Sequence, residues 1–100
     1  MGVDVFTALA DPVRRDLVRR LSRGPARVVD LAAGQSVSRP AVSRHLRALT
    51  DASLVVAEDV GRERHYRLTA SGLAPLTDYL ATLAPSPSAI PTARPTEETA

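Results

Sequence analysis

The stretch from Ser36 to Leu49 constrains the fold of this 100-residue chain most strongly, because it predicts a helix with two unlike faces. The Ser38 hydroxyl can accept from the free amides of a first helical turn, and Pro40 falls in that turn without losing a hydrogen bond. With about 100° between successive residues, apolar side chains collect on one side and polar ones opposite. The apolar side holds Val42, Leu46 and Leu49. The polar side holds Arg39, Ser43, Arg44 and Arg47.

The polar side of this predicted helix has a chemistry that suits DNA. Guanidinium groups match phosphate oxygens and the O6 and N7 edge of guanine in a major groove, and the strip contains no acid. An ordinary surface helix with a solvated basic face explains the same pattern. The stretch alone does not separate these two interpretations, so the flanking sequence has to decide.

Charge and composition point to one small domain with an anionic partner. The net charge is +2, and all 13 basic residues are arginine. The basic excess lies before residue 85, which favours a polyanion as partner. Aromatic residues make up only 3%, so we expect the small aliphatic core to need a second subunit. No stretch is long and apolar enough to span a membrane and no secretion signal opens the chain, so we expect a cytoplasmic protein.

The chain in order predicts a winged helix-turn-helix, mainly α with a small β-hairpin. Asp11 and Pro12 mark the start of the second helix as N-cap and first helical residue, and Gly24-Pro25 ends it. Five arginines lie on its outer face, and we interpret most of them as solvated: Arg14, Arg15, Arg19, Arg20 and Arg23. The expected elements are helices at 3–9, 12–23, 30–35, 38–52 and 71–84, a short strand at 27–29, and wing strands at 54–60 and 63–68 joined by a turn at Gly61-Arg62.

The end of the chain divides into a helix and a tail. Leu73, Leu76, Leu80 and Leu83 form an apolar stripe with Tyr79 beside it. Pro75 places the regular start of this helix at Gly72 or Leu73, because proline fits only a first turn without loss. Residues 85–100 are rich in Pro, Ser and Thr, and we expect a disordered tail. The predicted domain is therefore 1–84.

Four sequence pieces, in order, resemble the ArsR/SmtB family of bacterial repressors over residues 5 to about 83. The first is Phe6-Thr7-Ala8-Leu9-Ala10-Asp11-Pro12-Val13-Arg14, and the second is Asp30-Leu31-Ala32. The third, Ser38-Arg39-Pro40-Ala41-Val42-Ser43-Arg44-His45-Leu46, is similar to the recognition-helix signature. The fourth is the wing: Leu54-Val55, Gly61-Arg62 and Tyr66-Arg67-Leu68. Gln35, Ser36 and Ser53 depart from the family pattern, which usually has a buried aliphatic residue at the first position and turn glycines at the other two.

The resemblance implies a homodimeric repressor that binds a dyad-symmetric operator in double-stranded DNA. The first and last helices would form the dimer, through Val5, Phe6, Leu9, Leu73, Leu76, Leu80 and Leu83. The DNA-binding candidates are Ser38, Arg39, Ser43, Arg44 and Arg47 on the helix and Arg62 and Arg64 on the wing, where they can reach the backbone or minor groove.

Many relatives in this family release DNA when a metal binds, and here the sequence departs from the pattern. The metal motif of the third helix needs cysteine, and the chain has none. The motif of the last helix needs Asp and His, and Asp78 is the only candidate there. We therefore expect no metal and no cofactor, and the sequence does not identify an effector.

Two other classes of function remain as alternatives. A small enzyme would have to use His45 or His65 with Asp30, Asp51 or Asp59. We interpret His45 instead as a packing residue and His65 as facing DNA or solvent. A winged-helix protein-interaction module without DNA binding is the other alternative, but a protein partner would not require the basic strip.

Overall fold

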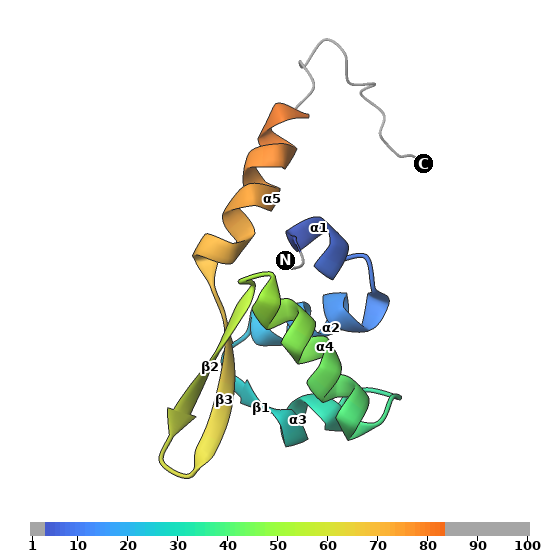
Figure 1. Cartoon of the computed structure of the whole chain (residues 1–100), viewed down its shortest axis with the longest axis vertical. Coiled ribbons are helices and arrows are strands. Elements are labelled where there is room, and N and C mark those ends of the chain that lie inside the picture. Colours follow the sequence, from blue (N-terminus) through green and yellow to red (C-terminus); the bar gives the residue numbers. More distant parts are fainter. Residues whose placement is uncertain (1–3, 84–100) are drawn as a thin grey trace, which may run out of the picture.

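The computed structural model of the chain describes residues 4–83 and shows a mainly helical fold with one small antiparallel sheet (Figure 1). Helices α3 and α4 form the helix-turn-helix and strands β2 and β3 form the wing, as predicted. The predicted tail at 85–100 lies outside the described residues. The elements in order are α1 (Val5–Ala8), α2 (Pro12–Leu21), β1 (Ala26–Arg27), α3 (Val28–Ala33), α4 (Arg39–Asp51), β2 (Val55–Val60), β3 (Glu63–Leu68) and α5 (Ala70–Thr82).

The caps of the two central helices form as the sequence predicts. Asp11 accepts from the amide of Arg14 at 3.2 Å at the start of α2, with Pro12 as the first helical residue. Ser38 accepts from the amide of Ala41 at 3.2 Å at the start of α4. These side chains satisfy amides that a helix start leaves without partners, so both helices begin where they were expected to begin.

The sheet has the order β1-β3-β2, with β3 in the middle and both pairings antiparallel. Gly61 adopts φ +63° in the wing turn, a conformation in which glycine is least strained. Strand β1 was predicted at 27–29, and this is wrong, because it comprises only Ala26 and Arg27. Those two residues pair with Tyr66 and His65 of β3.

Helix α3 begins two residues earlier than predicted and takes Val28 and Val29 from the expected strand. The β preference of valine is weak enough for tertiary context to override it. Asp30 still lies in the first turn of α3, where a carboxylate is favoured by the helix dipole.

One apolar cluster holds these elements together. Val42, Leu46 and Leu49 are each 0% exposed, so the apolar side of α4 is the side that enters the core. Val5 of α1 is buried in the same cluster with 4% exposure. Its sequence-based assignment to a subunit interface is corrected here: Asp4 caps α1, and Val5 then shares its inner face with Ala8. Helix α1 also covers fewer residues than the predicted 3–9.

Helix α4 ends in a Schellman motif, in which the amide of Leu54 donates to the carbonyl of Leu49 at 3.0 Å. Ser53, which follows the C-cap residue Ala52 and precedes Leu54, adopts φ +63°. This conformation favours glycine, so a serine there is strained by roughly 1–2 kcal/mol. Ser36, the other serine at an expected glycine position, has no such positive φ.

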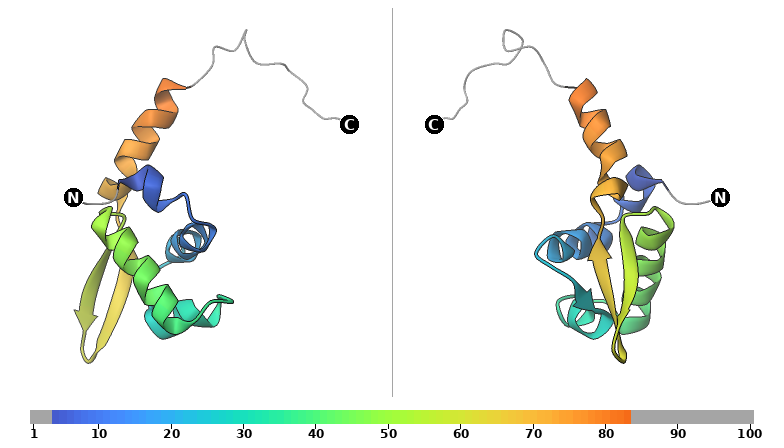
Figure 2. Two further views of the ribbon diagram at one scale, coloured as in Figure 1. Left: turned by 45° about the vertical axis from the view of Figure 1, so that its right-hand side comes forward. Right: turned by 90° about the vertical axis from the view of Figure 1, so that its left-hand side faces the viewer.

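Helix α5 begins at Ala70, earlier than the predicted Gly72 or Leu73, and Pro75 lies inside it. The reason is tertiary: the Thr69 hydroxyl accepts from the amide of Gly72 at 3.1 Å and donates to the carbonyl of Ser53 at 2.7 Å. The helix start is thereby attached to the end of α4. Beyond this point α5 extends away from the rest of the domain, with α1 beside its first turns (Figure 2). Within residues 4–83, no helix combines the length and apolar character needed to cross a membrane.

Candidate nucleic-acid interface

The outer face of α4 carries the predicted basic strip. Arg39, Ser43, Arg44 and Arg47 are all exposed, on the side opposite the three buried apolar residues. Among residues 4–83, no carboxylate lies within 4 Å of a nitrogen of these three arginines, although other arginines of the domain have such partners. The α4 guanidinium groups are therefore available to an external anion without breaking an ion pair in the described part of the chain.

The wing carries two further predicted residues. Arg62 is exposed next to the turn at Gly61, and Arg64 is exposed on β3. Arg64 Nε donates to Asp59 Oδ1 across the hairpin at 3.2 Å. An exposed pair of this kind contributes little to stability, so Arg64 can exchange it for a phosphate at small cost.

Concave surfaces connect α4 with the wing. One is lined by Ser43 and Arg47 of α4 together with Ala57, Arg64 and Tyr66 of the wing. A second joins Arg39 to Arg64, with Val29 of α3 beside them. The structure thus brings the helix candidates and Arg64 of the wing to one side of the molecule, where an extended anion can contact both.

An ion-pair cluster that includes the first residue of β3, next to the wing turn, was missed by the sequence analysis. Arg27 donates to Asp30 at 3.1 Å and to Glu63 at 2.7 Å, which connects β1, α3 and β3. Hydrogen bonding and charge from Arg27 lower the pKa of the Asp30 carboxyl. The pKa of Glu63 is lowered as well, first by its hydrogen bond with His65 and then by the charge of Arg27. No local pattern could reveal this cluster, because Arg27 and Glu63 are 36 residues apart in the chain.

The two histidines occupy different environments. His65 was expected to face DNA or solvent, but it is half-buried and its Nε2 lies 3.1 Å from Glu63 Oε1. His45 is half-buried between α4 and α2, as expected of a packing residue. Its Nδ1 accepts from Arg14 Nε at 3.2 Å and lies 3.6 Å from Asp11 Oδ2. Arg14 also donates to the carbonyl of Ala8 at 3.3 Å, so it is not one of the solvated arginines of this face.

The carboxylates considered for catalysis are mostly engaged elsewhere. Asp30 pairs with Arg27, and Asp59 pairs with Arg64. Asp51 lines the outer surface of α4 beside Ser43 and Arg47. In the part of the chain that the structure describes, no three His, Cys, Asp or Glu side chains gather in a way that could hold a metal ion.

The residues predicted for the dimer interface differ in how far their side chains are exposed in one subunit. Phe6, Leu80 and Leu83 are about half exposed, and Tyr79 packs edge-on against Phe6 with 5.3 Å between ring centroids. Leu9, Leu73 and Leu76 are partly buried against the core of their own subunit. The exposed members come from α1 and from the second half and end of α5, and these two helices lie at the end of the molecule away from the wing (Figures 1 and 2). We refer to these exposed residues as the apolar surface of α1 and α5.

Comparison with known proteins places this geometry in context. Residues 9–57 match the model of a helix-turn-helix domain family. The chain is 51% identical over 71 residues to the HTH-type transcriptional regulator Rv2034 of Mycobacterium tuberculosis, covering 71% of this chain and 66% of that protein. Its matches to three of the curated relatives span 66%, 49% and 59% of their lengths, about half to two thirds.

Solved structures show the same fold. A crystal structure of an ArsR family transcriptional regulator, RHA00566, has 35% identity and a TM-score of 0.72, covering 78% of this chain and 86% of that one. The solution structure of the homodimeric winged helix-turn-helix domain of Mb0332 from Mycobacterium bovis, described as a possible ArsR-family regulator, has 26% identity and a TM-score of 0.66. That match covers 79% of this chain and 73% of the other.

Proposed function

The chain belongs to the ArsR family of winged helix-turn-helix transcriptional regulators, and from this premise we propose that it is a homodimeric repressor that binds a dyad-symmetric operator in double-stranded DNA. It acts in the cytoplasm, where a bacterial operator is accessible. The observation that carries the proposal is the outer face of α4, with three exposed arginines and Ser43 opposite a fully buried apolar side.

Helix α4 is the recognition helix in this proposal. Arg39 and Arg44 enter the major groove, where a guanidinium can bind the O6 and N7 atoms of guanine with two hydrogen bonds. Ser38, at the N-terminus of the helix, lies where the first amides attract a phosphate. The capped start of α4 and its three buried side chains fix which way the arginines point, so the core of the domain supports base recognition.

The wing contacts the DNA backbone or the minor groove through Arg62 and Arg64. An arginine that touches only phosphates positions the protein without reading sequence. The two groups of arginines therefore have different roles, although all of them carry the same charge.

The dimer forms through the exposed apolar surface of α1 and α5. Phe6, Leu80 and Leu83 are exposed to solvent in one subunit, and their burial against a second copy removes that apolar surface from water. The homodimeric fold of the Mb0332 domain supports this arrangement. Two recognition helices related by a dyad read half-sites about 34 Å apart, or one duplex turn.

Selection of bound sequences from random duplex DNA, followed by footprinting and salt titration, tests the function. The wild-type protein should select a palindromic site with an affinity that falls steeply with salt. Arg39→Ala or Arg44→Ala should relax the preference at particular base pairs, by about 1–3 kcal/mol of discrimination each. Arg64→Ala should weaken all sequences alike and lower the salt slope by about one.

Arg15→Ala is the matched control, because Arg15 is an exposed arginine of α2 whose guanidinium donates a hydrogen bond only to the carbonyl of Leu9 among the described residues. It should leave base preference unchanged. If Arg39→Ala and Arg44→Ala both keep full affinity and the same preference, α4 does not read the groove. The absence of any salt-dependent DNA binding would favour a protein-interaction module instead.

The proposal includes no catalytic step and no metal cofactor. The chain has no cysteine and only two histidines, which lie in separate contacts with Arg14 and Glu63. Zinc, cobalt, nickel or copper should therefore leave operator affinity unchanged. Tight stoichiometric zinc binding that releases DNA would contradict this part of the proposal.

A further inference from the structure

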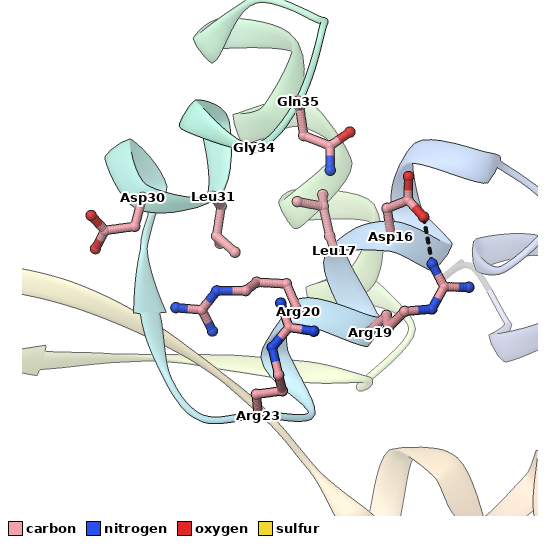
Figure 3. Close-up of a pocket in the computed structure, with 9 residues that line it drawn as sticks. All are labelled: Asp16, Leu17, Arg19, Arg20, Arg23, Asp30, Leu31, Gly34 and Gln35. Atoms are coloured by element: carbon pink, nitrogen blue, oxygen red, sulfur yellow. Dashed lines mark hydrogen bonds and ion pairs between the residues drawn. The ribbon is translucent and has the colours of Figure 1, made fainter.

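We propose that a cleft between α2 and α3 is a binding site for a small anion that carries two negative charges, such as a phosphate monoester or a short dicarboxylate. Arg20 of α2 and Arg23, two residues after α2, form one wall of the cleft, and Gln35, just after α3, lies across from them (Figure 3). The buried side chains of Leu17 and Leu31 lie between these polar groups.

The two carboxylates that line the cleft form ion pairs with arginines, whereas two of its arginines form none with the described residues. Asp16 is occupied by Arg19, with 2.7 Å between Oδ1 and Nη1, and Asp30 is occupied by Arg27. In residues 4–83 no carboxylate lies within 4 Å of a nitrogen of Arg20 or Arg23. Two guanidinium groups thus share one concave surface without a carboxylate of this part of the chain in ion-pair contact, although Asp30 is near enough for the charge of Arg20 to contribute to its lowered pKa. A bound anion would supply a direct partner for both arginines.

The donors in the cleft are largely free to turn toward a ligand. Arg20 donates only to the carbonyl of Gly24, at 3.3 Å, and is half-buried, so its stem is held in place. Among the described residues, the side chains of Arg23 and Gln35 form no hydrogen bond with protein. Planar guanidinium groups bind carboxylate or phosphate oxygens with two hydrogen bonds each, which suits a doubly charged oxyanion.

The size of the cleft limits the ligand. Its volume of about 280 Å³ lies just below the range of about 300–1,000 Å³ typical of ligand sites. A phosphate group or a four-carbon dicarboxylate is small enough for this space.

The position of the cleft connects it to DNA binding, and this consequence rests on the proposed function. Helix α3 is the first helix of the helix-turn-helix, and it packs directly against α4. A bound dianion cancels the positive charge of two arginines in this half of the domain. Operator affinity should therefore fall when the cleft is occupied, because the attraction between this half of the domain and the DNA phosphates is reduced.

Anion binding is tested first without DNA, so that its outcome does not depend on the proposed function. Inorganic phosphate and succinate are titrated separately into the ¹⁵N-labelled full chain, against sodium chloride at matched ionic strength. We expect saturable shifts of the Arg20 and Arg23 Nε–H signals and of the Gln35 side-chain amide with at least one probe. Arg20→Gln/Arg23→Gln should weaken binding at least tenfold, and Arg15→Gln should not.

Arg23→Gln alone provides a second variant that should fold normally, because the Arg23 side chain has no hydrogen-bond partner in the described structure. It should weaken binding severalfold. Shifts that do not saturate, that chloride reproduces, or that persist in both variants would overturn the proposal.

Regulation is tested afterwards by measuring operator affinity at constant ionic strength. The probe that binds should raise the Kd severalfold for the wild type and leave the double variant unaffected. An equal response of both proteins would overturn the regulatory role. If neither probe binds and the double variant instead loses about two units of salt slope, the cleft holds a DNA phosphate and the proposal is wrong.

Discussion

Replacing Gly72 with alanine should destabilise the domain, although helix propensity alone predicts the opposite. Gly72 is the third residue of α5, where alanine would normally gain about 1 kcal/mol over glycine. The structure leaves no room for the added methyl group. A Cβ atom would overlap the carbonyl oxygen of Ser53 and would lie 2.7 Å from Thr69 Oγ1.

The magnitude follows from what this overlap disturbs. Both atoms belong to the contact that attaches the start of α5 to the end of α4, where Thr69 donates to the carbonyl of Ser53 at 2.7 Å. Overpacking of this kind typically costs about 1–3 kcal/mol. A displaced Thr69 hydrogen bond costs about 1 kcal/mol more. When the helix-propensity gain of alanine is subtracted from these two costs, we expect a net destabilisation of about 1–3 kcal/mol for Gly72→Ala.

Thermal unfolding followed by circular dichroism, at one fixed protomer concentration, measures this effect. Each kcal/mol corresponds to about 4–8 °C in Tm for a domain of this size. The control is Gly34→Ala, because its Cβ would meet only the Leu31 carbonyl at 3.9 Å and its φ is −92°. That variant should be neutral or slightly stabilised. If Gly72→Ala melts at or above the wild-type temperature, the argued contact between α5 and Ser53 does not constrain the helix.

Three further outcomes are expected. Leu80→Glu places a charge in the apolar surface of α1 and α5 and should yield monomers in analytical ultracentrifugation; an unchanged dimer would exclude this surface. Ser38→Ala removes the α4 cap and should cost about 0.5–2 kcal/mol in urea unfolding; an unchanged midpoint would show that the cap contributes nothing. Folding lowers the pKa of Asp30 and Glu63, so their contribution is present above their ordinary values and lost as pH falls through the lowered ones. Arg27→Gln should therefore reduce the fall in Tm between neutral pH and pH 3, and an unchanged fall would contradict this account.

Features governed by neighbouring residues could be predicted from the sequence. The caps at Asp11 and Ser38 and the division of α4 into apolar and basic sides follow from hydrogen bonding within one turn and from helical periodicity. The turn at Gly61 follows from its tolerance of positive φ. The exposure of the candidate arginines of α4 could be predicted as well. Once the apolar face of the helix is buried, the opposite face must point to solvent.

Boundaries that depend on pairing or packing were predicted less well. Val28 and Val29 favour a strand locally, but β1 pairs with β3 for only two residues and the chain then turns into α3. Pro75 predicted a later start of α5, but the contacts of Thr69 with Ser53 and Gly72 place the start at Ala70. In each case a contact between distant segments outweighs a preference of a few tenths of a kcal/mol to about 1 kcal/mol.

The sequence by itself determined the helix-turn-helix and the basic side of α4, because caps and periodicity act within a few residues. Only the tertiary structure decided which apolar residues remain exposed, and it assigned Val5 to the core while leaving Phe6 and Leu80 at the surface. It also brought Arg27 to Glu63 and Gly72 to Ser53, across 36 residues in the first case. Such contacts depend on where whole helices and strands lie after packing, and no local sequence pattern predicts which distant residues will meet.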